Sequence, residues 1–88
     1  MTEFHAIANA AIWAFKARRL WLEARRKHRD MLFDFTRETG EWYTEVQDAT
    51  DYPHIEAAHK ERQEAAKEVR RTARKLRSLI RSHLREAS

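Results

Sequence analysis

The chain has 88 residues with no cysteine, one glycine, one proline and a formal net charge of +4. Without cysteine it has neither disulfide bonds nor thiolate zinc sites, and so short a chain buries little apolar surface, so we expect an oligomer or a partner to complete it. Abundant Ala, Glu, Lys, Arg and Leu and scarce turn residues predict an all-α protein.

The N-terminal part predicts a helix over about residues 2–38. Its apolar residues recur at three- and four-residue steps in two tracks, which predicts that the helix is covered on more than one side. The first track is Phe4, Ile7, Ala8, Ala11 and Phe15, and the second is Trp13, Ala17, Leu20, Ala24, Met31 and Phe35.

Membrane insertion and export are not expected from this segment. The uncharged run 4–15 is shorter than the roughly 20 residues of a membrane-spanning helix. Its positive charges, Lys16, Arg18 and Arg19, follow the run rather than precede it as in a secretory signal. We therefore expect a cytoplasmic protein.

The middle of the chain carries two boundary signals. Gly40 suits a left-handed residue just past a helix end, and a short helix is expected over about 41–50. Asp51 can cap the last helix, expected over about 52–86, and Pro53 falls in its first turn, where proline is accepted. We expect a single domain, 1–88, folded as an antiparallel helical hairpin with a short linking helix. A turn at Gly40, with 42–49 continuing into the last helix, is the alternative.

The last helix carries a heptad-like seam that predicts coiled-coil-like packing. The seam consists of Ile55, Arg62, Val69, Leu76 and His83 together with Ala58, Ala65, Thr72 and Leu79. His83 and Arg62 are expected to be partly buried polar residues that help to set the register.

The expected hairpin leaves an apolar overhang. At a rise of about 1.5 Å per residue, the last helix reaches back only to about residue 20. The segment 2–20 would then be uncovered, and we expect two overhangs to pair in a symmetric dimer. The expected dimer or partner interface is Phe4, Ile7, Ala11, Trp13, Phe15, Leu20 and Trp21.

Five arginines form a row on the last helix, hereafter the basic row: Arg70, Arg74, Arg77, Arg81 and Arg85. Guanidinium groups bind phosphates, so the row can track a nucleic-acid backbone, and the hairpin is expected to bring the basic block 18–29 near it. A solvated face partly neutralised by neighbours such as Asp30 and Asp34 is the alternative. Aromatic residues interleaved with Arg18, Arg19 and Arg25 suit base stacking or a membrane surface, but their helical spacing favours packing.

Catalytic and metal signatures are weak. Glu56 and His59 have the Glu-x-x-His spacing of di-metal helical bundles, but one such tetrapeptide in a chain with 14 acidic residues and five histidines is weak evidence. The serines lack a suitably spaced partner, and one glycine cannot build a phosphate-cradling loop. We expect no enzyme activity, no cofactor and no metal.

A small reading frame that begins at Met1 and encodes an Arg- and Trp-rich helical hairpin resembles the short accessory proteins with which bacteriophages bind or divert host machinery. The resemblance is one of overall style and implies no residue role. On physical grounds we expect a non-catalytic protein-binding module that dimerises through its apolar N-terminal helix and occludes or bridges a larger protein. A nucleic-acid-binding accessory protein using the basic row is the alternative, and membrane binding is not expected.

Overall fold

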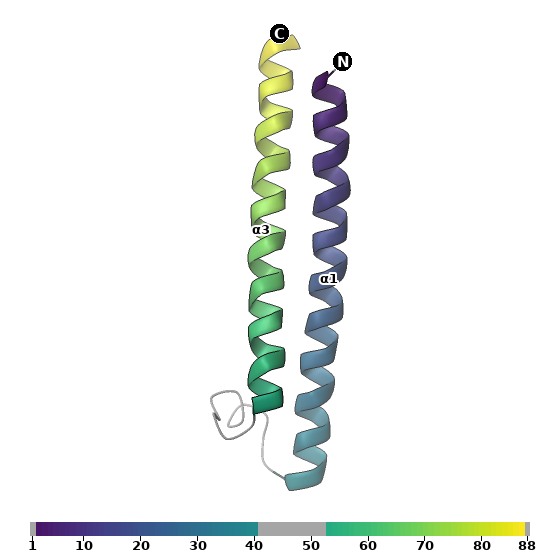
Figure 1. Ribbon diagram of the computed structural model, residues 1–88, viewed down its shortest axis with the longest axis vertical. Helices are drawn as coiled ribbons and strands as arrows, with labels where there is room; N and C mark the ends of the chain where they lie inside the picture. Colours follow the sequence, from purple (N-terminus) through teal and green to yellow (C-terminus); the bar gives the residue numbers. More distant parts are fainter. Residues whose placement is uncertain (1, 41–52, 88) are drawn as a thin grey trace.

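The computed structural model describes residues 2–40 and 53–87, which form two helices and no strand. Helix α1 spans Thr2–Thr39 and helix α3 spans Pro53–Ala87. The helices run antiparallel along their whole length, with both chain ends at one end of the hairpin (Figure 1). We call this the open end and the opposite one the loop end. The predicted all-α helical hairpin is confirmed, whereas the expected short helix over 41–50 and the Asp51 cap lie outside the described residues.

Both inner ends of the helices follow from local chemistry. Gly40 adopts a left-handed conformation with φ of 76°, and its backbone N–H donates a hydrogen bond to the carbonyl oxygen of Thr36 at 2.8 Å. This geometry closes the last turn of α1, and glycine adopts it at little cost. Pro53 begins α3, where its missing N–H removes no helical hydrogen bond. The helix end predicted at Gly40 is confirmed.

The expected overhang of residues 2–20 is wrong. At the open end the rings of Phe4 and His83 lie 4.8 Å apart, and nearer the loop end His28 packs 5.2 Å from His59. The two helices have 38 and 35 residues and are paired nearly end to end, giving overall dimensions of 60 × 17 × 16 Å. The expectation failed because it subtracted the length of α3 from residue number 53. The pairing in fact starts at the end of α1, near Thr39, and runs back from there toward Thr2.

The predicted seam of α3 faces α1. Its Ile55, Ala58 and Thr72 are buried and its other positions, including Arg62 and His83, are half-buried. The residues that α1 buries are Ala10, Ala17, Ala24, His28, Leu32 and Phe35.

The two expected apolar tracks of α1 do not mark two covered faces. Phe4, Ala8, Ala11 and Phe15 of the first track are exposed, and only Ile7 is half-buried. The second track is split: Ala17, Ala24 and Phe35 are buried and Met31 is half-buried, but Trp13 and Leu20 are exposed. A two-helix hairpin offers each helix one neighbour, so it covers only one stripe.

The core is concentrated at the loop end. Leu32, Phe35 and Ile55 form the cluster of large buried side chains. The open half is packed mainly through the small side chains of Ala10 and Ala17. The larger seam residues of this half are only half-buried, namely Ile7, Leu76 and Leu79. Its other large hydrophobic side chains are left on the surface.

Candidate protein-binding surface

Exposed apolar side chains gather in the open half of the hairpin. Phe15 is 69% exposed, Trp13 and Phe4 are each 62% exposed, and on α3 Leu84 is 61% exposed. The large hydrophobic residues exposed in this half are Phe4, Ile12, Trp13, Phe15, Leu20, Leu22, Ile80 and Leu84. So dense an apolar surface is typical of an interaction site.

One side of the hairpin combines apolar residues with both signs of charge. Lys27 Nζ and Glu61 Oε2 form an ion pair at 3.2 Å, which shows that these residues of α1 and α3 lie on the same side. Residues spaced by seven share a side of a helix when two helices pack along their length. The side marked by this pair, hereafter the mixed-charge flank, comprises Trp13, Lys16, Leu20, Glu23 and Lys27 of α1 with Glu61, Glu68 and Lys75 of α3. A shallow groove lined by Leu20, Glu23, Ala24, Lys27, Glu61 and Ala65 runs along it.

Apart from Glu56 near the loop end, which lies in line with Arg70 and Arg77, the described residues of the opposite side are apolar, basic or uncharged, without another acidic one. On each helix this side lies on the other side of the buried seam from Lys27 or Glu61. Side chains of both helices therefore border it as well. We call it the arginine flank; it comprises Phe4, Ala8, Ala11, Phe15, Arg18, Leu22 and Arg25 of α1 with Ala66, Arg70, Ala73, Arg77, Ile80 and Leu84 of α3. The two sides of the hairpin therefore differ in chemistry.

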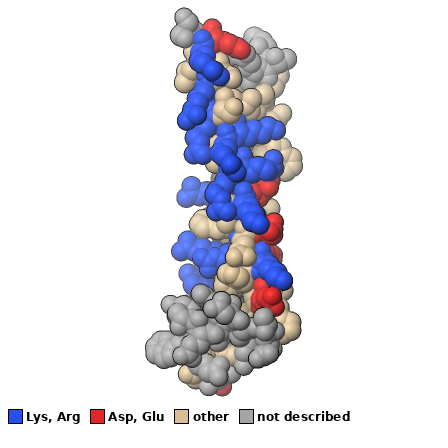
Figure 2. Space-filling model, turned by 90° about the vertical axis from the view of Figure 1, so that its left-hand side faces the viewer, with Lys and Arg blue, Asp and Glu red and all other residues tan. Residues whose placement is uncertain are grey.

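The acidic side chains that form ion pairs in the described residues do not neutralise the basic row. Asp34 pairs with Arg37, Asp30 lies 3.8 Å from Arg29, and Glu68 pairs with Arg71, whose hydrogen bonds lower the pKa of Glu68. Figure 2 shows Lys and Arg side chains along most of one face of the hairpin, with Asp and Glu near its top and along one edge from the middle downward. The suggested neutralisation of the row by Asp30 and Asp34 is not observed.

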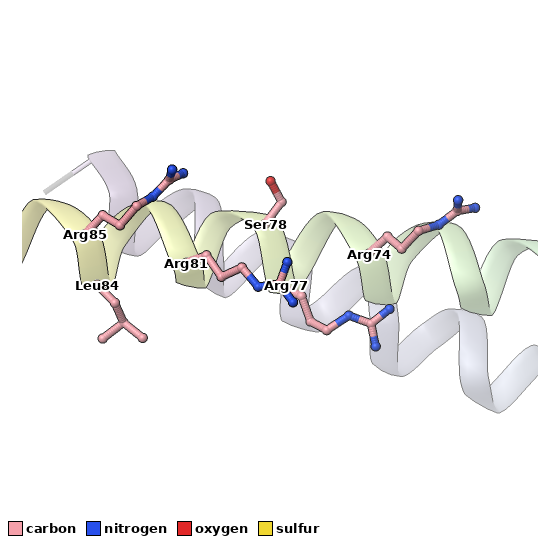
Figure 3. Close-up of a pocket in the computed structure, with 6 residues that line it drawn as sticks. All are labelled: Arg74, Arg77, Ser78, Arg81, Leu84 and Arg85. Carbon is pink, nitrogen blue, oxygen red and sulfur yellow. The ribbon is translucent and has the colours of Figure 1, made fainter.

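All five arginines of the basic row are exposed, and they fan around the outer side of α3. In Figure 3, Arg74 and Arg85 point to one side of the helix with Ser78, whereas Arg77 and Leu84 point to the other. Arg81 extends along the helix between them. The five guanidinium groups therefore do not lie in one line, and only Arg70 and Arg77 border the arginine flank.

The basic block 18–29 lies farther from the basic row than expected. Lys27 pairs with Glu61, so the block lies beside the first half and middle of α3. Phe4 contacts His83, so the nearly uncharged start of α1 is the neighbour of the basic row. The displacement has the same cause as the missing overhang, because both follow from the register of the helices.

The structure divides the predicted interface residues between the two flanks. Trp13 and Leu20 belong to the mixed-charge flank, and Phe4, Ala11 and Phe15 belong to the arginine flank. Ile7 and Trp21 are half-buried on the side of α1 that faces α3. The Lys16 ammonium lies 5.3 Å from the ring centre of Trp13, and the Arg25 guanidinium lies 5.5 Å from that of Trp21. Both cations are positioned to interact with the aromatic faces.

The sequence did not point to a polar cluster inside the hairpin. His28 is only 1% exposed, and Arg62 Nη1 donates a hydrogen bond to its Nδ1 at 3.4 Å. His28 Nε2 and His59 Nδ1 are buried without a hydrogen-bond partner among the described residues. Burial, and then the neighbouring His59 and Arg62, lower the pKa of His28. The sequence signal that could have revealed the cluster is the spacing by seven of Trp21, His28 and Phe35, which places all three on the side of α1 that faces α3.

The described residues contain no group of three side chains suited to a metal ion. Glu56 pairs instead with Lys60 at 3.3 Å, and His59 packs on His28. Neither described helix has an apolar stretch long enough to cross a bilayer.

Comparisons with known proteins return no match: no protein-family model, no curated protein and no solved structure is similar to this chain. The resemblance to bacteriophage accessory proteins therefore stays a prediction. The evidence for function lies in the hairpin itself.

Proposed function

We propose that the protein is a non-catalytic helical binding module that dimerises through the mixed-charge flank and presents its other apolar surface to a larger protein. The observation that carries this proposal is the concentration of exposed large hydrophobic residues in the open half, where the hairpin has its least buried core. Helices packed against this half would complete a core that two helices leave open.

The charges favour the mixed-charge flank as the surface that pairs with a second copy. A two-fold interface places the same patch on both subunits, so the patch must complement itself. The mixed-charge flank meets this requirement, since its Lys27 and Lys75 can approach Glu61 and Glu68 of the second copy. Trp13 and Leu20 provide the apolar area, at about 1.5 to 3 kcal/mol for each side chain fully covered. The coiled-coil-like packing expected of the hairpin would then extend to a four-helix bundle of two chains.

Sedimentation equilibrium tests this assignment with a matched pair of variants. The Trp13→Glu, Leu20→Glu variant places charge in the mixed-charge flank, and the Phe4→Glu, Phe15→Glu variant places the same charge in the arginine flank. We expect a dimer at micromolar concentration for the wild type and the second variant, and a monomer for the first. A monomeric wild type would refute dimerisation, and loss of the dimer in the second variant alone would place the interface on the other flank.

Nucleic-acid binding by the basic row is the second candidate, and the exposure of all five arginines favours it. Contacts with phosphates release counterions, so such binding weakens steeply as salt is raised. Fluorescence anisotropy with generic duplex and single-stranded DNA would show this dependence. Absence of binding at low salt would exclude this candidate.

A further inference from the structure

The arginine flank combines exposed apolar residues with positive charges that are unpaired among the described residues. Its exposed apolar residues include Ala11 and Phe15 of α1 and Ile80 and Leu84 of α3. Arg18 and Arg25 continue the line of Ala11 along α1, and Arg70 and Arg77 continue the line of Leu84 along α3. None of these four arginines forms an ion pair with a described residue.

We propose that the arginine flank binds an amphipathic helix whose apolar stripe is bordered by Asp and Glu residues. This inference rests on the proposed function and states the chemistry of the larger partner. An amphipathic helix lying along two antiparallel helices buries its stripe on their apolar side chains. The long side chains of the arginines could then reach the carboxylates beside the stripe, which guanidinium groups bind in bidentate geometry.

The small residues of the flank favour a helix over a nucleic acid. Ala8 and Ala11 on α1 and Ala66 and Ala73 on α3 leave space for a helix to approach closely. Single-stranded nucleic acids are bound by rows of aromatic rings on which bases stack. The flank offers only Phe4 and Phe15, eleven residues apart, which is about 16 Å along a helix.

A second copy of the chain fits this flank poorly. A two-fold contact through it would set Arg18 and Arg77 of one copy against the arginines of the other, and like charges in an interface disfavour binding. The same property makes the arginine flank selective for acidic partners.

Peptide binding provides the test. The probes are two designed helical peptides of about 20 residues with the same leucine stripe. The stripe is bordered by Glu in the acidic peptide and by Lys in the basic peptide, and a thymidine oligonucleotide is the third probe. We expect fluorescence anisotropy to show binding of the acidic peptide in the micromolar range, at least about ten-fold tighter than that of the basic peptide.

Charge reversal makes the test specific. The Arg18→Glu, Arg77→Glu variant should reverse the preference and bind the basic peptide more tightly, a gain that an unfolded variant cannot show. The matched control, Arg26→Glu, Arg74→Glu, changes the net charge equally. Arg26 lies two residues from both Ala24 and His28, which are buried, and Arg74 lies two residues from both Thr72 and Leu76 on the seam, so both arginines face outward. This control should keep the wild-type preference.

Three outcomes would overturn the inference. The first is that the wild type binds both peptides equally or binds neither. The second is that the preference is unchanged in the Arg18→Glu, Arg77→Glu variant. The third is that the oligonucleotide binds more tightly and displaces the acidic peptide. Sedimentation of the same samples separates the two proposals. A dimer that fails to select the acidic peptide contradicts this inference alone, whereas a monomeric wild type contradicts the proposed dimerisation.

Discussion

The buried imidazole of His28 makes hairpin stability depend on pH. Arg62 donates to its Nδ1, so the ring proton of the neutral form lies on Nε2. A second proton would place a buried positive charge beside Arg62 and His59, and the pKa of His28 is lowered by its burial and by these neighbours. The neutral form is therefore the one compatible with the folded hairpin.

The sign and size of the effect follow from proton linkage. Above the ordinary histidine pKa of about 6.5, His28 is neutral in both folded and unfolded chains and contributes no pH dependence. As the pH falls below 6.5 the unfolded chain takes up the proton first, so the free energy of unfolding decreases until the folded pKa is reached. One histidine can contribute a slope of at most about 1.4 kcal/mol per pH unit.

Urea unfolding followed by far-UV circular dichroism measures this dependence. We would compare wild type, His28→Leu and the exposed control His54→Leu at about pH 7.5, 6.5 and 5.5, at one chain concentration because association shifts apparent stability. Wild type and His54→Leu should lose stability below pH 6.5, and His28→Leu should lose less. Parallel curves for wild type and His28→Leu would refute the reasoning.

Three further predictions concern the fold. Ile55→Ala removes a side chain that is 2% exposed in the cluster with Leu32 and Phe35, and should lower the free energy of unfolding by about 2 to 5 kcal/mol in urea titration; a loss below about 1 kcal/mol would contradict the assigned core. In Gly40→Ala the added Cβ would meet no atom within 4 Å, but the alanine must adopt positive φ. The free energy of unfolding should therefore fall by about 1 to 2 kcal/mol, and an unchanged unfolding midpoint would contradict the assigned helix end. Lys27→Gln should change stability by less than about 1 kcal/mol, because the pair with Glu61 is exposed, and a larger loss in the same titration would show that the pair is desolvated.

The sequence predicted the helices better than their register. Periodicity and the Gly40 and Pro53 signals were sufficient to place the helices, because these signals act within a few residues. The seam of α3 was also read correctly, since alternating spacings of three and four leave few other faces to bury. Register depends on contacts between distant residues, such as Phe4 with His83 and Lys27 with Glu61, which no local pattern specifies.

The candidate surface could be predicted only in part. Apolar residues at Phe4, Trp13 and Phe15 indicated an interface. Their tracks separated Trp13 from the other two, but the expected interface combined all three, whereas Trp13 lies across the hairpin from Phe4 and Phe15. The seam of α1 was obscured because alanine fills much of it while larger apolar residues surround it. His28 was missed because a histidine among apolar residues gives no sign of burial until the facing helix is known.

The environment of Trp13 tests the central claim, that another helical surface covers the open half, most directly. A variant with Trp21→Phe and Trp42→Phe keeps Trp13 as its single tryptophan. Its emission should lie at short wavelength at high chain concentration and shift to longer wavelength on dilution, as the dimer dissociates and Trp13 enters water. Emission typical of water-exposed tryptophan at every concentration would contradict the proposed dimer.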